Sequence, residues 1–312
     1  MPEVQQVHID AALTNVSVAF RNEDYIADLV APPVPVRKQS DRYYIYDTER
    51  EGLRQTPDFR APGAEANEVN FSLSSDSYYC EDHALTSAVP DEERENADPI
   101  LQPDIDRTEF LTDRILLNRE IALENTLRTT SGLGEEDVDA AEVWNNVDFD
   151  PLPTIQSARL AVFAACQRRA NTVVIPYTAF EVLRNHPKVV DRIKYSTTGV
   201  LNEALLAQVL GVERVLVPRS FKNTAVKGQT TAVEEVWGKN CYVLHVPARA
   251  AARQVALAYS FVWNGAAGSV NGTVVEKWRE PSRKAEMVRV QKYYDHKIIA
   301  AGAGFRLLNV IE

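Results

Sequence analysis

The fold is decided by residues 171–218, which read NTVVIPYTAFEVLRNHPKVVDRIKYSTTGVLNEALLAQVLGVERVLVP. The run 172–175 is short, apolar and rich in β-branched residues, which is typical of a strand buried on both faces. A helix follows over 177–184 and ends at the proline beyond it, because the residue before a proline avoids the helical region. A second helix over 198–210 and a second strand over 215–217 complete a compact α/β unit.

The ends of the second helix and two later segments extend this unit. Thr198 is the predicted N-cap, and Gly211 stands where a left-handed C-cap is needed. Residues 241–246 form another continuous apolar run and predict a third strand of the unit. The closing segment 305–311 predicts a last strand that the same unit takes up.

Composition limits the class of protein. The 312 residues are 45% hydrophobic and 25% charged, which is enough for a substantial core and predicts two subdomains. The formal charge of -10 excludes the basic excess of a dedicated nucleic-acid binder. Cys80, Cys166 and Cys241 are far apart and odd in number, which favours a reducing compartment over disulfides or a zinc site. No stretch reaches the roughly 20 apolar residues of a spanning helix, so membrane contact is not expected.

The first 38 residues predict an N-terminal arm. Apolar and polar residues mix over 2–20, and Pro32, Pro33 and Pro35 then exclude a helix or the interior of a sheet. We expect an extended arm that lies along another surface, either of its own chain or of a neighbour, because its apolar side chains need cover.

Residues 39–76 predict an extended hairpin loop. The two arms are strands at 41–47 and 69–73, and the tip between them carries prolines, glycines and charges of both signs. A two-stranded ribbon is marginal alone in water, so we expect strand addition or an adjacent subunit to complete it. The candidate interface residues are the prolines of the arm and the arginines of the tip, namely Pro32, Pro33, Pro35, Arg50, Arg54 and Arg60. Charge reversal at Arg54 is expected to impair assembly and to leave the subunit folded.

A long helix and a late sheet account for most of the remainder. The helix runs over 104–130, with acidic residues in its first turn and an apolar stripe along one face. A shorter helix begins at Thr154, with Leu160 and Phe163 among its inward residues. Three segments predict the strands of an antiparallel sheet: 254–263, 273–278 and 287–299. In the first half of the last segment apolar and polar residues alternate strictly, so one face of that strand is expected to be exposed to solvent.

The order of these segments resembles the major capsid proteins of tailed bacteriophages over nearly the whole chain. The stretches that carry the resemblance are Ala31–Val36, Tyr43–Leu73, the helix from Asp104, Val173–Pro176 with Phe180 and His186–Pro187, Leu205–Ala207 with Leu210–Val212, Trp237–Asn240 and Asp295–Ile298. The resemblance implies an α+β fold. Its parts would be the arm, the extended hairpin, an axial α/β domain (151–247 and 297–312) and a peripheral domain (77–150 and 248–296) with the long spine helix.

The resemblance also implies function and partners. Many copies would form an icosahedral shell of hexamers and pentamers around a double-stranded DNA genome, assembled in the host cytoplasm and found in the virion, with no catalysis and no cofactor. The resemblance also implies a portal protein, and it leaves open whether cementing proteins attach to the shell. Some relatives begin with a cleaved scaffolding segment, for which the residues before Pro32 leave no room, so a separate scaffolding protein is expected. Contact with DNA is expected to be weak and salt-screened. The basic candidates, which solvated faces explain equally well, are Arg168, Arg169, Arg249, Arg253, Arg283 and Lys284.

Two other classes remain as alternatives. A cytoplasmic α/β enzyme would need a catalytic constellation, but the thiol of Cys80 near His83 lacks a third group, and Gly302-Ala303-Gly304 lacks the third glycine of a dinucleotide loop. His186 and His296 stand alone beside turns, where hydrogen bonding is favoured over metal binding. The nearer alternative is an encapsulin, a shell of the same fold around a cargo enzyme. Encapsulins usually start with a cargo-binding helix, and the proline-rich arm argues against one.

Overall fold

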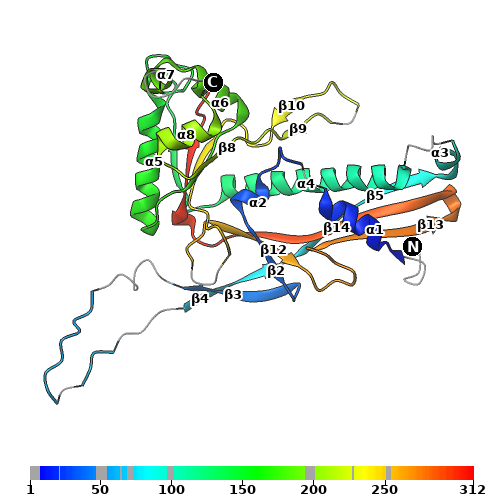
Figure 1. Ribbon diagram of the computed structural model, residues 1–312, viewed down its shortest axis with the longest axis horizontal. Helices are drawn as coiled ribbons and strands as arrows, with labels where there is room; N and C mark the ends of the chain where they lie inside the picture. The colour runs from blue at the N-terminus through cyan, green and yellow to red at the C-terminus, as the bar shows by residue number, and fades with distance from the viewer. Residues whose placement is uncertain are drawn as a thin grey trace.

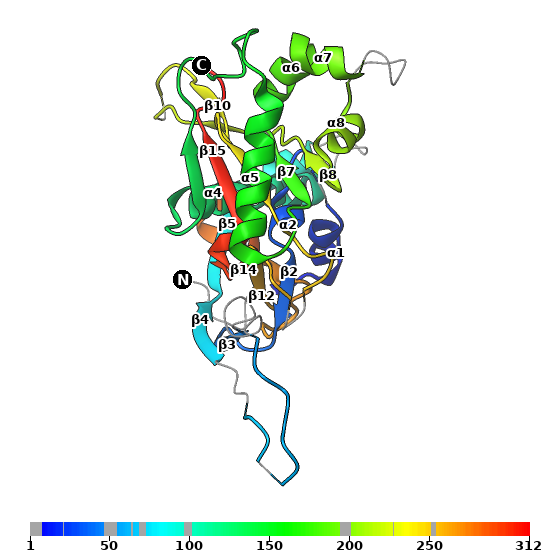
Figure 2. The same ribbon diagram turned by 90° about the vertical axis from the view of Figure 1, so that its left-hand side faces the viewer.

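The computed structural model describes residues 8–20, 22–46, 55–63, 65–68, 73–96, 102–193, 201–226, 228–250 and 254–312. In this part of the chain two large sheets pack against helices, and two ribbons of two strands each form separate small sheets. The loop that joins the strands of one ribbon reaches away from the rest of the molecule (Figures 1 and 2). Helices and sheets are thus mixed along the chain, and the predicted α+β class is confirmed.

The first sheet contains the α/β unit. Its strand order is β6-β15-β11-β7-β8, and β7 is parallel to β8 and antiparallel to β11. The bounds are β6 (Gly134–Asp137), β7 (Thr172–Val174), β8 (Arg214–Leu216), β11 (Cys241–Leu244) and β15 (Gly304–Leu308). All residues of β7 and β11 are buried, as expected for central strands without polar alternation. The four strands predicted for this unit are confirmed, and β6 joins them at the edge.

The helices of this unit are α5 (Pro151–Cys166), α6 (Tyr177–Asn185), α7 (Pro187–Ile193) and α8 (Glu203–Leu210). α6 confirms the predicted first helix, whereas α7 was not predicted; its proline suits the first turn of a new helix. α8 begins later than predicted because Asn202 caps it, its side chain accepting a 2.8 Å hydrogen bond from the backbone N–H of Leu205. Gly211 has a φ of +64°, which confirms the C-cap. Thr198 lies outside the described residues.

The second sheet is organised around the long strand β14 (Ala285–Ile298). β5 pairs along one edge of β14, while β13 and then β12 pair along the other, and β1 and β2 flank them. The bounds are β1 (His8–Ile9), β2 (Pro33–Val36), β5 (Glu81–Pro90), β12 (Ala258–Trp263) and β13 (Thr273–Glu280). The antiparallel sheet is confirmed, but the wet face of β14 is not: Met287 and Gln291 are buried as well as Val288. Large neighbours such as Trp278, opposite Met287, cover that face.

Helix α4 (Pro103–Thr129) confirms the predicted long helix within one residue at each end. Its 27 residues span about 40 Å, and it packs on β14 and β5. The buried stripe includes the apolar Leu123 and Leu127 and, less expectedly, Arg119, Glu120 and Glu124. A helix that buries charged side chains must pair them with groups from other segments.

The N-terminal segment is not extended throughout, which corrects the prediction. Residues 11–19 form helix α1 (Ala11–Ala19), capped by Asp10, whose side chain accepts from the backbone N–H groups of Ala12 and Leu13. The buried face of α1 consists of Leu13, Thr14 and Ser17, and Ser17 hydrogen-bonds Thr112 of α4 at 2.7 Å. Since small polar residues occupy buried positions, the sequence showed no apolar helical period. A short helix, α2 (Ala27–Val30), follows.

Helix α5 differs from its prediction in cap and orientation. Asp150 caps it instead of Thr154, because the proline after Asp150 fits the first helical position and the Asp150 carboxylate accepts from the Leu152 N–H. Ile155 is fully buried as expected, but Leu160 is 68% exposed and Phe163 48% exposed. The two side chains predicted to face inward therefore face solvent.

The extended hairpin is present. β3 (Ser40–Tyr46) pairs with β4 (Leu73–Tyr79), with Ser40 opposite Tyr79. The second arm lies further along the chain than predicted, and part of the predicted 69–73 segment lies outside the described residues. The remaining elements are α3 (Asp91–Glu95), after β5, and a second ribbon made of β9 (Phe221–Asn223) and β10 (Val233–Glu235).

Candidate assembly surfaces

The hairpin loop offers an apolar group to solvent at its tip. Every described residue of the loop, 55–63 and 65–68, is exposed. Phe59 is 86% exposed, more than any other large hydrophobic residue of the described chain, and Arg60 beside it is exposed as well. Arg50 and Arg54 lie outside the described residues, so their predicted interface role stays a prediction. Because this apolar side chain is almost fully exposed, the tip is a candidate contact surface.

The base of the hairpin, in contrast, is fixed to its own chain. Tyr78 stacks on Phe261 of β12 with 4.6 Å between ring centroids, and Tyr43 lies 5.1 Å from the same ring. The N–H of Cys80 donates a 2.9 Å hydrogen bond to the Gln39 carbonyl where the ribbon ends. The ribbon therefore leaves the sheet in a direction set by packed aromatic side chains.

The proline arm pairs with its own chain as edge strand β2. β2 is parallel to β12, and the carbonyls of Pro32 and Val36 accept hydrogen bonds of 3.2 and 3.0 Å from Ser260 and Asn264. Backbone groups of alternate residues point to the same side of a strand, so the imide nitrogens of Pro33 and Pro35 stand on the open side, where they offer no donor. This edge of the sheet is thus protected against addition of another strand. Whether the three prolines also contact a neighbour stays a prediction.

A buried carboxylate ties the arm to the long helix. The carboxylate of Glu120 on α4 accepts from the backbone N–H groups of Ile26 and Ala27 at 3.2 and 2.7 Å and from the Trp237 indole at 2.6 Å. Burial raises the pKa of Glu120, and these three donors oppose the rise. One side chain of the helix thereby positions the start of α2 and the segment that leads into β11.

Next to Glu120, charged groups surround a cleft of about 860 Å³ between the arm, α4 and the second sheet. Arg119 and Lys292 line it, and an Nη of Arg119 lies 2.6 Å from an Oδ of Asp28. Burial would raise the pKa of Asp28, but the charge of Arg119 lowers it below its usual value. Burial, followed by repulsion from Arg119, lowers the pKa of Lys292 to about 8 and that of His296 to about 3. His296 is therefore a neutral, hydrogen-bonded histidine, with Nδ1 2.7 Å from the Ser260 hydroxyl.

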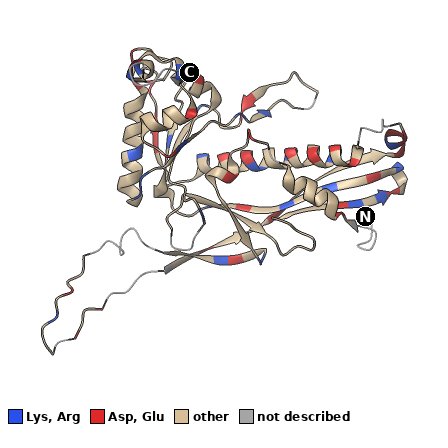
Figure 3. Cartoon of the chain, in the orientation of Figure 1, with Lys and Arg blue, Asp and Glu red and all other residues tan. Residues whose placement is uncertain are grey.

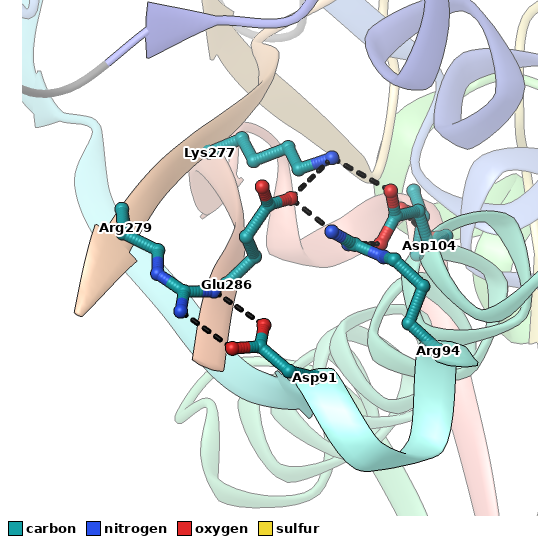
Figure 4. A network of polar contacts seen from close by, with 7 residues as sticks. Asp91, Arg94, Asp104, Lys277, Arg279 and Glu286 are labelled. Carbon is teal, nitrogen blue, oxygen red and sulfur yellow. Dashed lines mark hydrogen bonds and ion pairs between the residues drawn. The ribbon is translucent and has the colours of Figure 1, made fainter. Parts of the chain in front are cut away.

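Charged residues also join the far end of α4 to the sheet. Figure 3 shows both signs along α4 and the strands beside it, and Figure 4 shows the cluster at its start. Arg94 contacts Asp104 at 2.7 Å and Glu286 at 2.9 Å, and Lys277 contacts the same two carboxylates at 2.6 and 2.7 Å. Hydrogen bonds from Arg94, and then from Lys277, lower the pKa of Glu286 to about 2. This closed ring of two cations and two anions fixes the start of the helix on β13 and β14.

The residues considered for catalysis are buried, stacked on an aromatic ring, part of a turn, or hydrogen-bonded to the backbone. Burial raises the pKa of the Cys80 thiol to about 12, and His83 stacks on Tyr294 at 4.1 Å. Gly302 and its neighbours form a 3-10 turn before β15, and His186 approaches the Asn146 carbonyl at 3.1 Å. Within the described ranges no cluster of three or more His, Cys, Asp or Glu side chains could hold a metal. The helices of that same part of the chain include none that is long and apolar enough to cross a bilayer.

Comparison with known proteins decides the family. No protein-family model matches the chain. The major capsid protein of Pseudomonas phage JBD67 is 30% identical over 244 residues, which cover 76% of this chain and 77% of that protein. The chain belongs to the phage major capsid proteins. The major capsid protein of Burkholderia phage BcepMu is 25% identical over 310 residues, 97% of this chain and 96% of that protein. The resemblance seen in the sequence is confirmed, and the chain is a structural shell subunit.

Solved structures agree on the fold. A phage-related protein from Bordetella bronchiseptica superposes with a TM-score of 0.76 at 20% identity, covering 97% of both chains. An encapsulin from Synechococcus elongatus superposes with a TM-score of 0.55 at 12% identity, covering 97% of this chain and 96% of that chain. Phage capsids and encapsulins thus share the fold, while the sequence relatives are capsid proteins.

Proposed function

We propose that this major capsid protein forms hexamers and pentamers that close into an icosahedral shell around double-stranded DNA. The observation that carries this proposal is the hairpin loop, whose described residues are all exposed on a firmly packed base. A projecting ribbon with an apolar tip is not self-sufficient, and a lattice of copies supplies a partner for each tip. Many such weak contacts give a stable particle through avidity.

The two large sheets correspond to two domains of the proposed shell subunit. We propose the first sheet with α5–α8 as the axial domain at capsomer centres and the second sheet with α4 as the peripheral domain. Residues 134–150, assigned from the sequence to the peripheral part, lie with the first sheet: β6 pairs with β15, and the backbone N–H of Trp144 donates to the Val310 carbonyl at 2.8 Å. We therefore place the boundary of the axial domain at the end of α4.

The same proposal covers partners and place. The subunit functions without catalysis, as its relatives are structural proteins, and assembles in the host cytoplasm before it becomes part of the virion. A separate scaffolding protein and a portal direct assembly, and cementing proteins would add to the outer face. Contact with packaged DNA is weak, because the chain carries a net charge of -10 and its basic candidates are few, either single residues or adjacent pairs.

Electron microscopy of the purified full-length chain, produced with and without the phage's scaffolding protein, tests the proposal. We expect closed particles of uniform size, and a variant whose hairpin tip is replaced by a short glycine-serine turn should stay as folded, unassembled subunits. A wild-type chain that stays monomeric under both conditions would contradict the proposal. Particles that contain a cargo enzyme in place of DNA would instead favour an encapsulin.

A further inference from the structure

Helix α5 presents an uncharged face to solvent. Arg159 is its only Asp, Glu, Lys or Arg residue, and that guanidinium is used inside the chain, donating to the carbonyls of Leu210 and Gly211 at the end of α8. Leu160 and Phe163 are 68% and 48% exposed on the outer side. Helices on a protein surface normally carry charged residues on their solvent side. This face of α5 therefore has the composition of a covered surface.

A second apolar patch lies on the β9–β10 ribbon. Phe221, Val226 and Val233 are 49%, 70% and 61% exposed. The two paired strands have three residues each, and so short a ribbon gains little stability from its own pairing. It stands out from the axial domain, where no other sheet covers it (Figure 1). Its apolar side chains, like those on α5, are exposed to solvent in the single subunit.

The two patches lie on opposite sides of the axial domain. In Figure 1 α5 forms the left side of this domain and β9–β10 projects from its right side; in Figure 2, which faces that left side, α5 is in front. A ring of identical subunits uses a head-to-tail contact, in which one side of each copy meets the opposite side of the next. Opposed, mutually complementary patches are what such a contact requires.

We propose that, around each capsomer, the β9–β10 ribbon of one subunit packs on the outer face of α5 of the next copy. The register of the ribbon supports the pairing. Glu235 pairs with Phe221 and Asn223 with Val233, so the side chains of Phe221 and Val233 lie on the same face. Lys222 and Glu234 pair on the opposite face, away from these two apolar side chains.

A second copy fits both patches better than another protein does. A scaffolding or cementing protein would have to cover an apolar helix and an apolar ribbon on opposite sides of the same domain. One head-to-tail contact covers both at once and repeats around the ring. The inference rests on the proposed assembly into rings of copies and adds the residues that meet there.

Cysteine trapping in particles of the full-length chain tests the contact. The variant pairs are Leu160→Cys with Val233→Cys and Phe163→Cys with Val226→Cys, since the native Cys80, Cys166 and Cys241 are buried. Oxidation should give a ladder of linked subunits up to the size of the ring, lost on reduction. Val270→Cys with Val233→Cys is the matched control, because Val270 is 43% exposed in the loop before β13, outside the axial domain, and should stay unlinked.

Other trapping results would overturn the inference. Particles that form normally but show no more linking than the control exclude this contact. Dimers from Leu160→Cys alone indicate a two-fold contact between α5 helices, and a link to a different protein assigns the patch to that protein. A wild-type chain that forms no particles would contradict the proposed shell function itself. This outcome differs from normal particles without the predicted links, which contradict only the contact between α5 and the ribbon.

Substitutions on the two faces of the ribbon give an independent test. Val233→Asp, on the apolar face, should lower the yield of particles at least fivefold, whereas Glu234→Gln, on the opposite face, should leave the yield unchanged. Both residues are exposed, so the melting temperature of unassembled subunits should stay at the wild-type value. A normal yield from Val233→Asp, or an equal loss from Glu234→Gln, contradicts the contact.

Discussion

Glu120 and Trp237 are 117 residues apart in the chain and form a buried hydrogen bond of 2.6 Å. The acceptor lies on the long helix α4, and the donor lies just before β11, the central strand of the first sheet. The same carboxylate receives two backbone N–H groups of the arm. The arm, the long helix and the first sheet are therefore held together at one point, which fixes the direction of each relative to the others.

Trp237→Phe tests this junction. The variant keeps most of the ring and removes the donor, and we expect the free energy of unfolding of unassembled subunits to fall by about 2 kcal/mol. Trp144→Phe is the matched control: Trp144 is as buried as Trp237, but its indole N–H has no hydrogen-bond partner in the described structure. Equal losses in urea denaturation of the two variants would show that the hydrogen bond contributes nothing.

The charge ring at the start of α4 predicts acid sensitivity. Arg94 and Lys277 lower the pKa of Glu286 from 4.5 to about 2, so the folded state binds fewer protons than the unfolded state between these values. The stabilisation is complete above pH 4.5 and is lost as the pH falls towards 2. Glu286→Gln should lower the free energy of unfolding at pH 7 by about 1–2 kcal/mol, since the partly exposed ring is screened by solvent.

The pH profile of unfolding checks this prediction. The difference between wild type and Glu286→Gln should shrink as the pH falls below 4.5. Glu142→Gln, on an exposed side chain, should leave the whole profile unchanged. A difference that does not depend on pH in this range would assign the effect to packing instead of charge.

Local patterns explain which elements the sequence predicted. The run 172–175 and the long helix were found because apolar residues marked a buried strand and a helical stripe directly. Helix α1 was missed because Thr14 and Ser17 occupy its buried face through hydrogen bonds, where a pattern of apolar residues would be expected. The prediction for Leu160 and Phe163 was wrong for the opposite reason: both are apolar and were expected to face inward, yet they face solvent on α5. A run of apolar residues in a sequence does not distinguish an exposed apolar face from a buried one.

The candidate surfaces were predictable to a similar extent. The projecting hairpin followed from two strand-like segments around a tip rich in proline and glycine. The charge ring did not, because Arg94 and Glu286 are 192 residues apart and show no local spacing. The protection of the sheet edge by Pro33 and Pro35 needed the pairing with β12, which only the structure provides.

Lys292 in the cleft predicts a stability cost. Burial and Arg119 lower its pKa from 10.5 to about 8, so the folded state binds fewer protons than the unfolded state between pH 8 and 10.5. The contribution of Lys292 to the free energy of unfolding rises with pH in this window. Lys292→Met should therefore stabilise unassembled subunits at pH 7 by about 1–3 kcal/mol and remove the rise. Lys297→Met, at a partly exposed lysine of the same strand, should do neither; destabilisation by Lys292→Met would refute the prediction.

Gly272 predicts a steric limit at the turn before β13. Its φ is +70°, and an added Cβ would lie 2.3 Å from a methyl carbon of Val262. Gly272→Ala should cost about 3 kcal/mol, the sum of backbone strain and overpacking. Gly228→Ala, at a φ of +94° with open space around it, isolates the backbone part and should cost about 1 kcal/mol. Similar melting temperatures for the two variants would mean that Val262 moves aside freely.

Substitution of Phe59 is expected to change the stability of the particle and not that of the isolated subunit. Its side chain contributes little to the isolated subunit, because it is 86% exposed, so Phe59→Asp should change the free energy of unfolding of the subunit by no more than about 0.5 kcal/mol. If the ring packs on a neighbour, each copy loses a buried anchor worth about 2 kcal/mol or more, and the particle should melt at a lower temperature. Phe59→Leu keeps an apolar anchor and should lie between wild type and Phe59→Asp. Calorimetry of particles measures this order, and particles of Phe59→Asp that melt like wild type would show that neighbours leave the tip in solvent.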